Sequence, residues 1–150
     1  MLKYVPSLTD IVMEEIPGKV TLALEISNCR GNCTGCHSPF LKEDIGEELT
    51  PAVLDKLIDN NFGVNCVLLL GEGRDPEAVR SIASYLRDAH PGLERAVYSG
   101  RSEVEDELFE LFDYVKVGPY IPERGPLNNR NTNQRLYHHR EDITSKFWRK

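Results

Sequence analysis

The feature that most constrains the fold is a regular alternation of strand-like and helix-like segments between residues 20 and 117. In residues 20–26, large apolar side chains alternate with Thr21, Ala23 and Glu25 at a period of two, which is typical of a strand. Residues 64–70 form an almost continuous apolar run, which indicates a strand buried on both faces. The expected strands are 20–26, 64–70, 93–98 and 114–117, and the expected helices begin at Thr50-Pro51, at Asp75-Pro76 and at a capping box of Ser102 and Glu105.

Strands that alternate with helices at this spacing predict an α/β fold with a parallel sheet. Ligands of such sheets bind at the carboxyl ends of the strands, so the residues that follow each strand are candidates for a binding site. Glycine, which lets a ligand approach the backbone closely, occurs in these segments. The strand-end segments are residues 27–37, Gly71-Glu72-Gly73, Ser99-Gly100 and Gly118-Pro119.

The two ends of the chain carry weaker patterns. Residues 3–5 and 11–16 are expected to pair as a hairpin near the turn at Pro17-Gly18. From Pro119 onward the sequence has no periodicity until residues 143–148, where Phe147 and Trp148 are expected to anchor the chain end. We therefore expect a single domain over residues 1–150, with a core at 19–118 and an irregular C-terminal segment at 119–150.

The composition limits the class of protein. A chain of 150 residues with 40% hydrophobic side chains can build one core, but not two of ordinary size. The longest apolar run, Cys66–Leu70, is far shorter than the roughly 20 residues that span a bilayer, so we expect a soluble, cytoplasmic protein without membrane contact. The net charge of −6 disfavours nonspecific binding to nucleic acid, which leaves a small molecule or another protein as the expected partner.

Cysteines 29, 33 and 36 have C-x3-C-x2-C spacing directly after the first expected strand. Thiolates hold iron–sulfur clusters, and a four-iron cluster takes four ligands, so Cys29, Cys33 and Cys36 would leave one iron open. The same triplet would make a closed zinc site if His37 or Cys66 supplied a fourth ligand. Cys66 is more simply a small buried side chain in a strand, and three clustered cysteines plus one do not suggest a disulfide framework.

The cysteine spacing after the first core strand, followed by an acidic glycine loop after the next, resembles the radical S-adenosylmethionine superfamily. Within it, the chain is similar to the activating proteins of anaerobic ribonucleoside-triphosphate reductase, and the similarity covers nearly the whole chain. The stretches that carry this narrower resemblance are Cys36-His37-Ser38-Pro39, Lys116-Val117-Gly118-Pro119-Tyr120 and Thr132-Asn133-Gln134-Arg135-Leu136.

The resemblance implies a partial (β/α) barrel with parallel strands, in which Cys29, Cys33 and Cys36 ligate a [4Fe-4S] cluster. The amino and carboxylate groups of S-adenosylmethionine would bind the open iron. Reduced flavodoxin or ferredoxin would deliver the electron that cleaves this cofactor. The resulting 5′-deoxyadenosyl radical would take a hydrogen atom from a backbone glycine of the large reductase subunit and leave a glycyl radical there.

The resemblance also assigns residues to the S-adenosylmethionine site. Glu72 would hold the amino group of the cofactor, because a carboxylate suits an ammonium. Backbone groups at Gly35 and His37 would meet the adenine, and Ser99 would reach the ribose or the methionine part. The implied cofactor-binding residues are Gly35, Cys36, His37, Gly71, Glu72, Gly73 and Ser99.

Two positions depart from the family pattern. Leu70 stands where the first glycine of a pair is expected, and Gly35 replaces a residue that is often bulky. Both positions affect the shape of the nucleotide pocket. Neither removes a cysteine ligand.

Other interpretations of the same residues stay open. A non-catalytic iron–sulfur electron carrier or a zinc-stabilised interaction module would use the same cysteines, and the radical could instead act on another glycyl-radical enzyme or on a small molecule. Glu72 could be a solvated turn carboxylate, and Lys116 could be a satisfied charge beside the strand ends. His138 and His139 lie in a polar, arginine-rich stretch and are expected at the surface.

Overall fold

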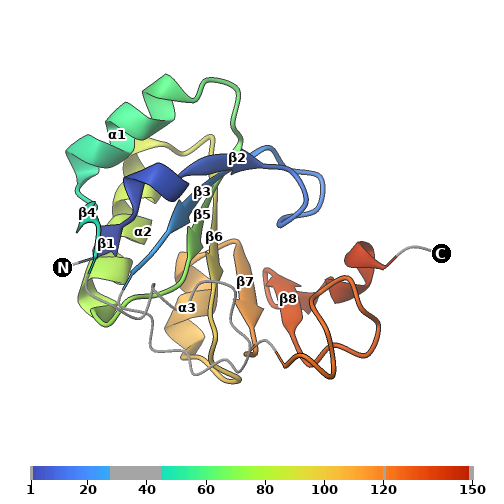
Figure 1. The fold of residues 1–150 in the computed structure, drawn as a ribbon. Helices are drawn as coiled ribbons and strands as arrows, with labels where there is room; N and C mark the ends of the chain where they lie inside the picture. Colours follow the sequence, from blue (N-terminus) through green and yellow to red (C-terminus); the bar gives the residue numbers. More distant parts are fainter. Residues whose placement is uncertain (1, 28–44, 120, 149–150) are drawn as a thin grey trace.

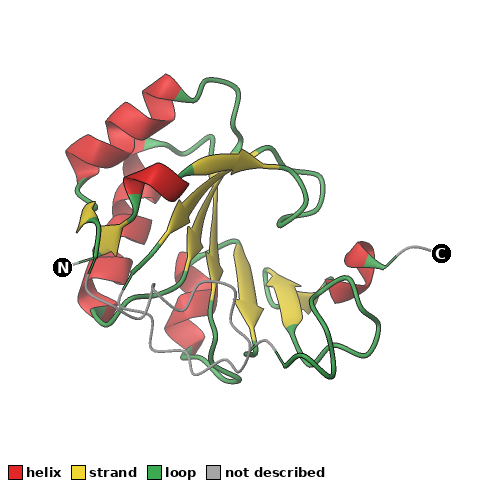
Figure 2. Cartoon of the chain, viewed as in Figure 1, coloured by secondary structure: helices red, strands yellow, loops and turns green. Residues whose placement is uncertain are grey.

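The computed structural model describes residues 2–27, 45–119 and 121–148, which form an α/β fold (Figures 1 and 2). The main sheet has seven strands in the order β2-β3-β5-β6-β7-β8-β9, and a small second sheet pairs β1 with β4. The strands are β1 (Lys3–Tyr4), β2 (Asp10–Val12), β3 (Thr21–Glu25), β4 (Glu47–Glu48), β5 (Cys66–Leu70), β6 (Glu94–Tyr98), β7 (Tyr114–Val117), β8 (Arg135–His138) and β9 (Glu141–Asp142). The helices are η1 (Pro6–Leu8), α1 (Pro51–Asn60), α2 (Pro76–Ala89), α3 (Asp106–Leu111) and η3 (Thr144–Phe147).

The strands β3, β5, β6 and β7 are parallel neighbours, as the sequence predicts, whereas β2, β8 and β9 pair antiparallel. Their register aligns Glu25 with Leu70, Leu70 with Tyr98, and Tyr98 with Lys116. The parallel strands therefore end side by side, and the segments that follow them lie along one edge of the sheet.

The first two α-helices begin where the sequence predicts. Thr50 caps α1 by accepting a hydrogen bond at its Oγ from the backbone N–H of Val53 at 3.2 Å. Asp75 caps α2 in the same way, with its Oδ1 3.1 Å from the backbone N of Ala78. In both helices proline occupies the first turn, where no backbone donor is needed.

The predicted capping box of the third helix is wrong. The helix α3 begins at Asp106, and its N-cap Glu105 makes no side-chain capping bond. Ser102 lies before the helix in a bend. The Glu105 carboxylate pairs instead with the guanidinium of Arg101, because a charged partner is within reach.

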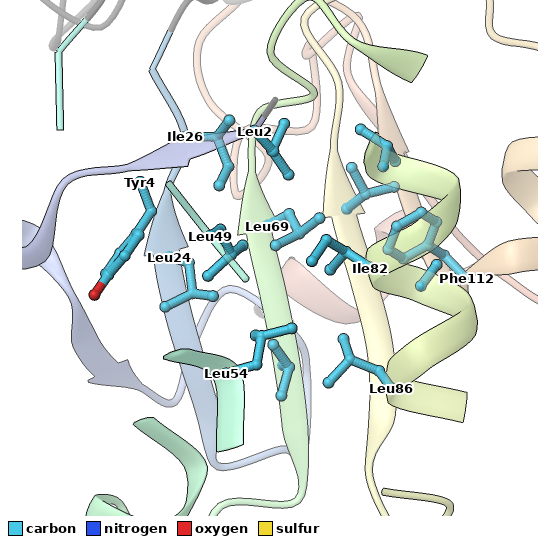
Figure 3. Close-up of a cluster of buried hydrophobic side chains, with 14 of the residues drawn as sticks. Leu2, Tyr4, Leu24, Ile26, Leu49, Leu54, Leu69, Ile82, Leu86 and Phe112 are labelled. Carbon is cyan, nitrogen blue, oxygen red and sulfur yellow. The ribbon is translucent and has the colours of Figure 1, made fainter. Parts of the chain in front are cut away.

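Buried side chains form one layer on each face of the main sheet, because successive residues of a strand point to opposite sides. On the face covered by α1, α2 and α3, the side chains of β3 and β5 pack against those of the helices (Figure 3). On the other face, the strands pack against Ile16 of the β2–β3 connection and against the C-terminal part of the chain. The helix-side layer includes Leu24, Leu54, Leu69, Ile82, Leu86 and Phe112, and the opposite layer includes Ala23, Cys66, Leu68, Ala96, Leu136 and Ile143.

The N-terminal strands do not pair with each other as predicted. β1 pairs with β4, while β2 pairs with β3 through the connection that contains Pro17-Gly18. The β1–β4 pairing buries Leu2 and Tyr4 against Leu49. An exposed hairpin would leave the side chains of Leu2 and Tyr4 in water. The backbone N–H of Ser27 donates to the carbonyl of Lys3 at 3.1 Å, so β1 lies beside the end of β3.

The prediction of an irregular C-terminal segment is wrong for residues 135–142. β8 extends the sheet antiparallel to β7, and β9 follows it as the edge strand. Leu136 and Ile143 are buried in the layer opposite the helices. The indole N–H of Trp148 donates to the carbonyl of Leu127 at 3.0 Å, which agrees with the predicted anchoring of the chain end.

The main sheet is open within the described residues. Its strand order ends at β2 on one side and at β9 on the other, and these two strands do not pair. Across the same part of the chain, no helix has both the length and the apolar character needed to cross a membrane.

Candidate functional site

Segments from neighbouring parallel strands meet at the carboxyl edge of the sheet, as the topology predicts. Ser27 lies just beyond β3, and the loop 71–73 follows β5. Ser99 follows β6, and its backbone N–H donates to the carbonyl of Lys116 on β7 at 2.8 Å. Gly118 follows β7 directly.

The cysteines that motivated a metal site lie outside the described residues. Cys29, Cys33 and Cys36, with Gly35 and His37, fall within residues 28–44. Their sequence follows Ser27 directly. The Ser27 side chain is fully buried, and its Oγ has no hydrogen-bond partner among the described residues.

The glycines on either side of Glu72 are required by the backbone. Gly71 and Gly73 have φ angles of 123° and 64°, and residues other than glycine rarely adopt such positive values. A Cβ atom on Gly73 would lie 2.8 Å from a terminal methyl of Leu2, and one on Gly71 would lie 3.4 Å from the carbonyl oxygen of Ile26. These glycines let the loop pack against the end of β3 and so fix the position of Glu72.

Glu72 is the centre of a cluster of charged and polar side chains, called here the Glu72 cluster (Glu72, Ser99, Arg101 and Glu105). The Glu72 side chain is only 10% exposed. Its Oε2 accepts hydrogen bonds from Ser99 Oγ at 2.5 Å and from Arg101 Nε at 3.1 Å. Its Oε1 accepts from Arg101 Nη2 at 2.5 Å. The predicted alternative of a freely solvated turn carboxylate is therefore wrong.

Arg101 joins two carboxylates in this cluster. Its Nη1 and Nη2 also donate to the two carboxylate oxygens of Glu105 at 2.8 and 3.0 Å, which makes a bidentate ion pair that guanidinium geometry favours. The hydrogen bonds to Glu105 and then to Glu72 raise the pKa of Arg101 further above its already high value, so the group stays charged. Glu105 is 64% exposed, so the buried part of the charge pairing is the part with Glu72.

Of the stretches that carry the narrower resemblance, 116–119 and 132–136 lie together at the end of β7, and Tyr120 lies outside the described residues. Lys116 is buried, and its Nζ donates to the carbonyl of Gly118 at 3.1 Å and lies 5.3 Å from the centre of the Tyr98 ring. Gln134 Nε2 lies 3.4 Å from the same carbonyl. Lys116 is therefore a buried charged side chain whose ammonium group is stabilised by contacts within the fold.

The described residues line one cavity beside the Glu72 cluster and another away from it. One of about 140 Å³ is lined by Glu72, Arg101 and Glu105 together with side chains of α2 and α3. The other, of about 940 Å³, lies between residues 13–18 and the C-terminal segment, and Glu72 does not line it. Sites for small organic ligands enclose about 300–1,000 Å³, so the cavity at Glu72 holds at most part of such a ligand within the described residues.

Cys66 lies at the opposite end of the sheet. It begins β5, is fully buried, and burial raises the pKa of its thiol to about 12. The predicted interpretation as a buried side chain is confirmed. Four residue steps separate Cys66 from Leu70, about 13 Å of strand, which disfavours Cys66 as a fourth ligand at the carboxyl edge.

The sequence identified Glu72 and Ser99 as site residues, and the structure places them in contact. The sequence analysis did not identify Arg101 and Glu105 as site residues, although their spacing of four residues is one at which opposite charges often pair. The partner Glu72 is distant in sequence, so only the fold brings the three together. Comparisons of the chain with protein-family models, with curated proteins and with solved structures found no match.

Proposed function

We propose that this chain is a radical S-adenosylmethionine activating enzyme that generates a glycyl radical on the large subunit of anaerobic ribonucleotide reductase. The observation that supports the proposal most directly is the position of Glu72. Its loop follows β5, the parallel neighbour of the strand that precedes the cysteines, and its carboxylate contacts Ser99 beyond the next strand. A strand-end carboxylate beside three thiolates is the arrangement that the resemblance implies.

The donors and acceptors of the Glu72 cluster suit the amino-acid part of S-adenosylmethionine. A carboxylate accepts about four hydrogen bonds, and Glu72 accepts three from the described residues, which leaves one acceptor site that suits an ammonium group. A guanidinium has five N–H donors, and Arg101 places four of them on Glu72 and Glu105. The remaining donor would suit a carboxylate. Glu72 and Arg101 would thus orient the two charged groups of one α-amino acid.

In this proposal Cys29, Cys33 and Cys36 ligate a [4Fe-4S] cluster, and the open sheet is a partial (β/α) barrel. When bound, the cluster and S-adenosylmethionine supply one-electron chemistry that the side chains of the protein lack. The protein would act in the cytoplasm with reduced flavodoxin or ferredoxin as electron donor. The chain's own residues bind and orient the cofactor and hold a charged carboxylate beside it.

The test is anaerobic reconstitution with iron and sulfide, followed by electron paramagnetic resonance of the reduced protein with and without S-adenosylmethionine. We expect a reduced-cluster signal that changes when the cofactor is added. Cys29→Ala, Cys33→Ala and Cys36→Ala should each abolish cofactor cleavage. A colourless protein that retains zinc, or a cluster whose signal ignores the cofactor, would contradict the proposal and leave a zinc module or an electron carrier.

A matched pair of variants tests the role of Glu72. Glu72→Gln and Glu105→Gln each remove one carboxylate that pairs with Arg101, but only Glu72 lies at the end of a parallel strand. We expect Glu72→Gln to weaken S-adenosylmethionine binding by about tenfold or more while the cluster absorption stays unchanged, and Glu105→Gln to have a smaller effect. Equal affinities of the two variants and the original protein would show that Glu72 does not bind the cofactor.

A further inference from the structure

A second cluster of metal-ligating side chains lies at the amino end of the parallel strands. Glu94 begins β6, His138 ends β8, and His139 follows in the turn to β9. One ligand atom from each of these residues lies within 4.8 Å of the other two. We propose that Glu94, His138 and His139 form a binding site for a late first-row divalent cation such as Zn²⁺, at the end of the sheet opposite the Glu72 cluster. This inference does not depend on the proposed function.

The donor set suits such a cation. Imidazole nitrogens and carboxylate oxygens are the ligands of many zinc and iron(II) sites, and three protein ligands leave a position for water or substrate. Ligands at about 2.0–2.1 Å from a tetrahedral zinc lie about 3.3 Å apart. His138 Nε2 and Glu94 Oε2 are already 3.3 Å apart. His139 is the most exposed of the three, at 62%, so the ligand that must move furthest is the least confined by packing.

The first histidine ring is held in place by its neighbours. The imidazole of His138 stacks on the ring of Tyr114 with 4.2 Å between centroids and 11° between planes. Tyr114 is also the residue opposite His138 in the β7–β8 register. A ring fixed before a ligand binds loses little freedom on binding, which favours affinity.

The backbone of the turn brings the second histidine to the first. Successive residues of an extended strand point to opposite faces, which would separate the two rings. His139 instead has a φ angle of 47°, and its ring centroid lies 4.4 Å from that of His138. Arg140 also has a positive φ, of 71°, so this two-residue turn has the conformation that usually requires Asn-Gly.

Charged groups around the cluster favour a cation. Asp113 Oδ1 lies 3.5 Å from His139 Nε2, where it can orient the imidazole as carboxylates do at many metal sites. Lys19 pairs with Oε1 of Glu94 and leaves Oε2 on the side of His138. Two carboxylates and one ammonium give these groups a net charge of about −1, which a divalent cation would offset.

The variants that test this site are chosen to preserve the fold. His139→Asn removes the ligand but keeps a residue that tolerates a positive φ. His138→Phe removes both ring nitrogens but keeps an aromatic ring to stack on Tyr114. Glu141→Gln, in the same hairpin and exposed, removes a carboxylate outside the cluster and serves as the control.

The experiment is a titration of each full-length protein with Zn²⁺, read out as bound metal and as thermal stability. We expect the original protein and Glu141→Gln to bind one equivalent more than His139→Asn and His138→Phe, or to bind that equivalent at least 10–100-fold more tightly. Binding of Zn²⁺ at this site should raise the melting temperature of the original protein and of Glu141→Gln, but not that of His139→Asn or His138→Phe. The same Zn²⁺ stoichiometry and affinity in all four proteins would overturn the proposal.

Titration with Co²⁺ separates this site from the cysteines, because thiolates are also ligands for zinc. Thiolate ligation gives cobalt an intense sulfur-to-metal charge-transfer band, whereas imidazole and carboxylate ligands give only weak ligand-field bands. We expect a ligand-field component without charge transfer that is lost in His139→Asn and kept in Glu141→Gln. A spectrum of the original protein that His139→Asn leaves unchanged would overturn the site, whatever the state of the cysteines.

Discussion

The replacement of Glu72 by glutamine tests whether the Glu72 cluster stabilises the carboxyl edge of the sheet in the absence of any ligand. Glutamine keeps the shape and one carbonyl acceptor but removes the charge. In the structure the carboxylate accepts hydrogen bonds from Ser99 at 2.5 Å and from Arg101 at 2.5 and 3.1 Å. The substitution therefore removes the charge from three hydrogen bonds and leaves an acceptor for one or two of them.

The expected loss follows from the burial of the partners. A hydrogen bond to a charged group contributes about 1.5–3 kcal/mol, and Glu72 is almost buried at 10% exposure. Arg101 is 29% exposed and keeps Glu105 as a partner in the variant, so it is not left as an unpaired buried charge. We expect Glu72→Gln to lower the free energy of unfolding by about 2–3 kcal/mol. Glu105→Gln, at 64% exposure, should lower it by about 0–1 kcal/mol.

The assay is urea unfolding of both variants and the original protein, followed by far-ultraviolet circular dichroism at one ionic strength. The midpoint should shift while the slope stays constant, because the surface exposed on unfolding is nearly the same. A loss below about 0.5 kcal/mol in Glu72→Gln, or an equal loss in Glu105→Gln, would refute the reasoning. It would mean that solvent screens the Glu72–Arg101 pair as it screens an ordinary surface pair.

Three further predictions concern other parts of the fold. Gly73→Ala should lower the free energy of unfolding by about 1–2 kcal/mol in the same urea assay, because φ at Gly73 is positive and a Cβ would lie 2.8 Å from Leu2. Cys66→Ala should leave unchanged the number of thiols that react with a disulfide reagent in the native protein, because Cys66 is buried and burial raises its pKa to about 12; a loss of one reactive thiol would contradict this. The hydrogen bond from His90 lowers the pKa of Asp55 below its usual value of 3.8, so this pair stabilises the fold above about pH 4 and stabilises it less as the pH falls further. Asp55→Asn should flatten the decline of stability in that acid range, and an unchanged acid profile would show that the pair contributes nothing.

The elements that the sequence predicts well are those whose signals are local. Thr50 and Asp75 each supply a cap and a following proline within two residues, and both helices begin there. The buried strand β5 is a continuous apolar run and β6 is bounded on both sides by turn residues, so the positions of both strands follow from the sequence within one or two residues. Because the parallel order follows from the alternation of strands and helices, the carboxyl-edge site of Glu72 and Ser99 was predictable too.

The elements that the sequence misses depend on contacts between distant parts of the chain. β8 is four residues long with Leu136 as its only buried residue, so it has no detectable period of two. Its pairing with β7 satisfies the edge of the parallel sheet, which no local pattern reports. In the same way, the sequence places His138 and His139 at the surface, and only the β7–β8 register brings them to Glu94.

The two sites lie at opposite ends of β6, which allows a test of whether they act independently. Glu94 begins this strand and Ser99 follows it, so five residue steps, about 16 Å, separate the two ends. Substitutions more than about 7–10 Å apart without shared partners usually change stability additively within about 0.3–0.5 kcal/mol. We therefore expect the double variant of Glu72→Gln and His139→Asn to lose the sum of the two single losses in urea. Zn²⁺ at 100 times its dissociation constant for this site should add about 2.7 kcal/mol through the site to both proteins that keep His139, and nothing through it to the other two. A departure from additivity above about 1 kcal/mol would show that β6 transmits strain between its ends, and the two sites would then have to be treated as one coupled system.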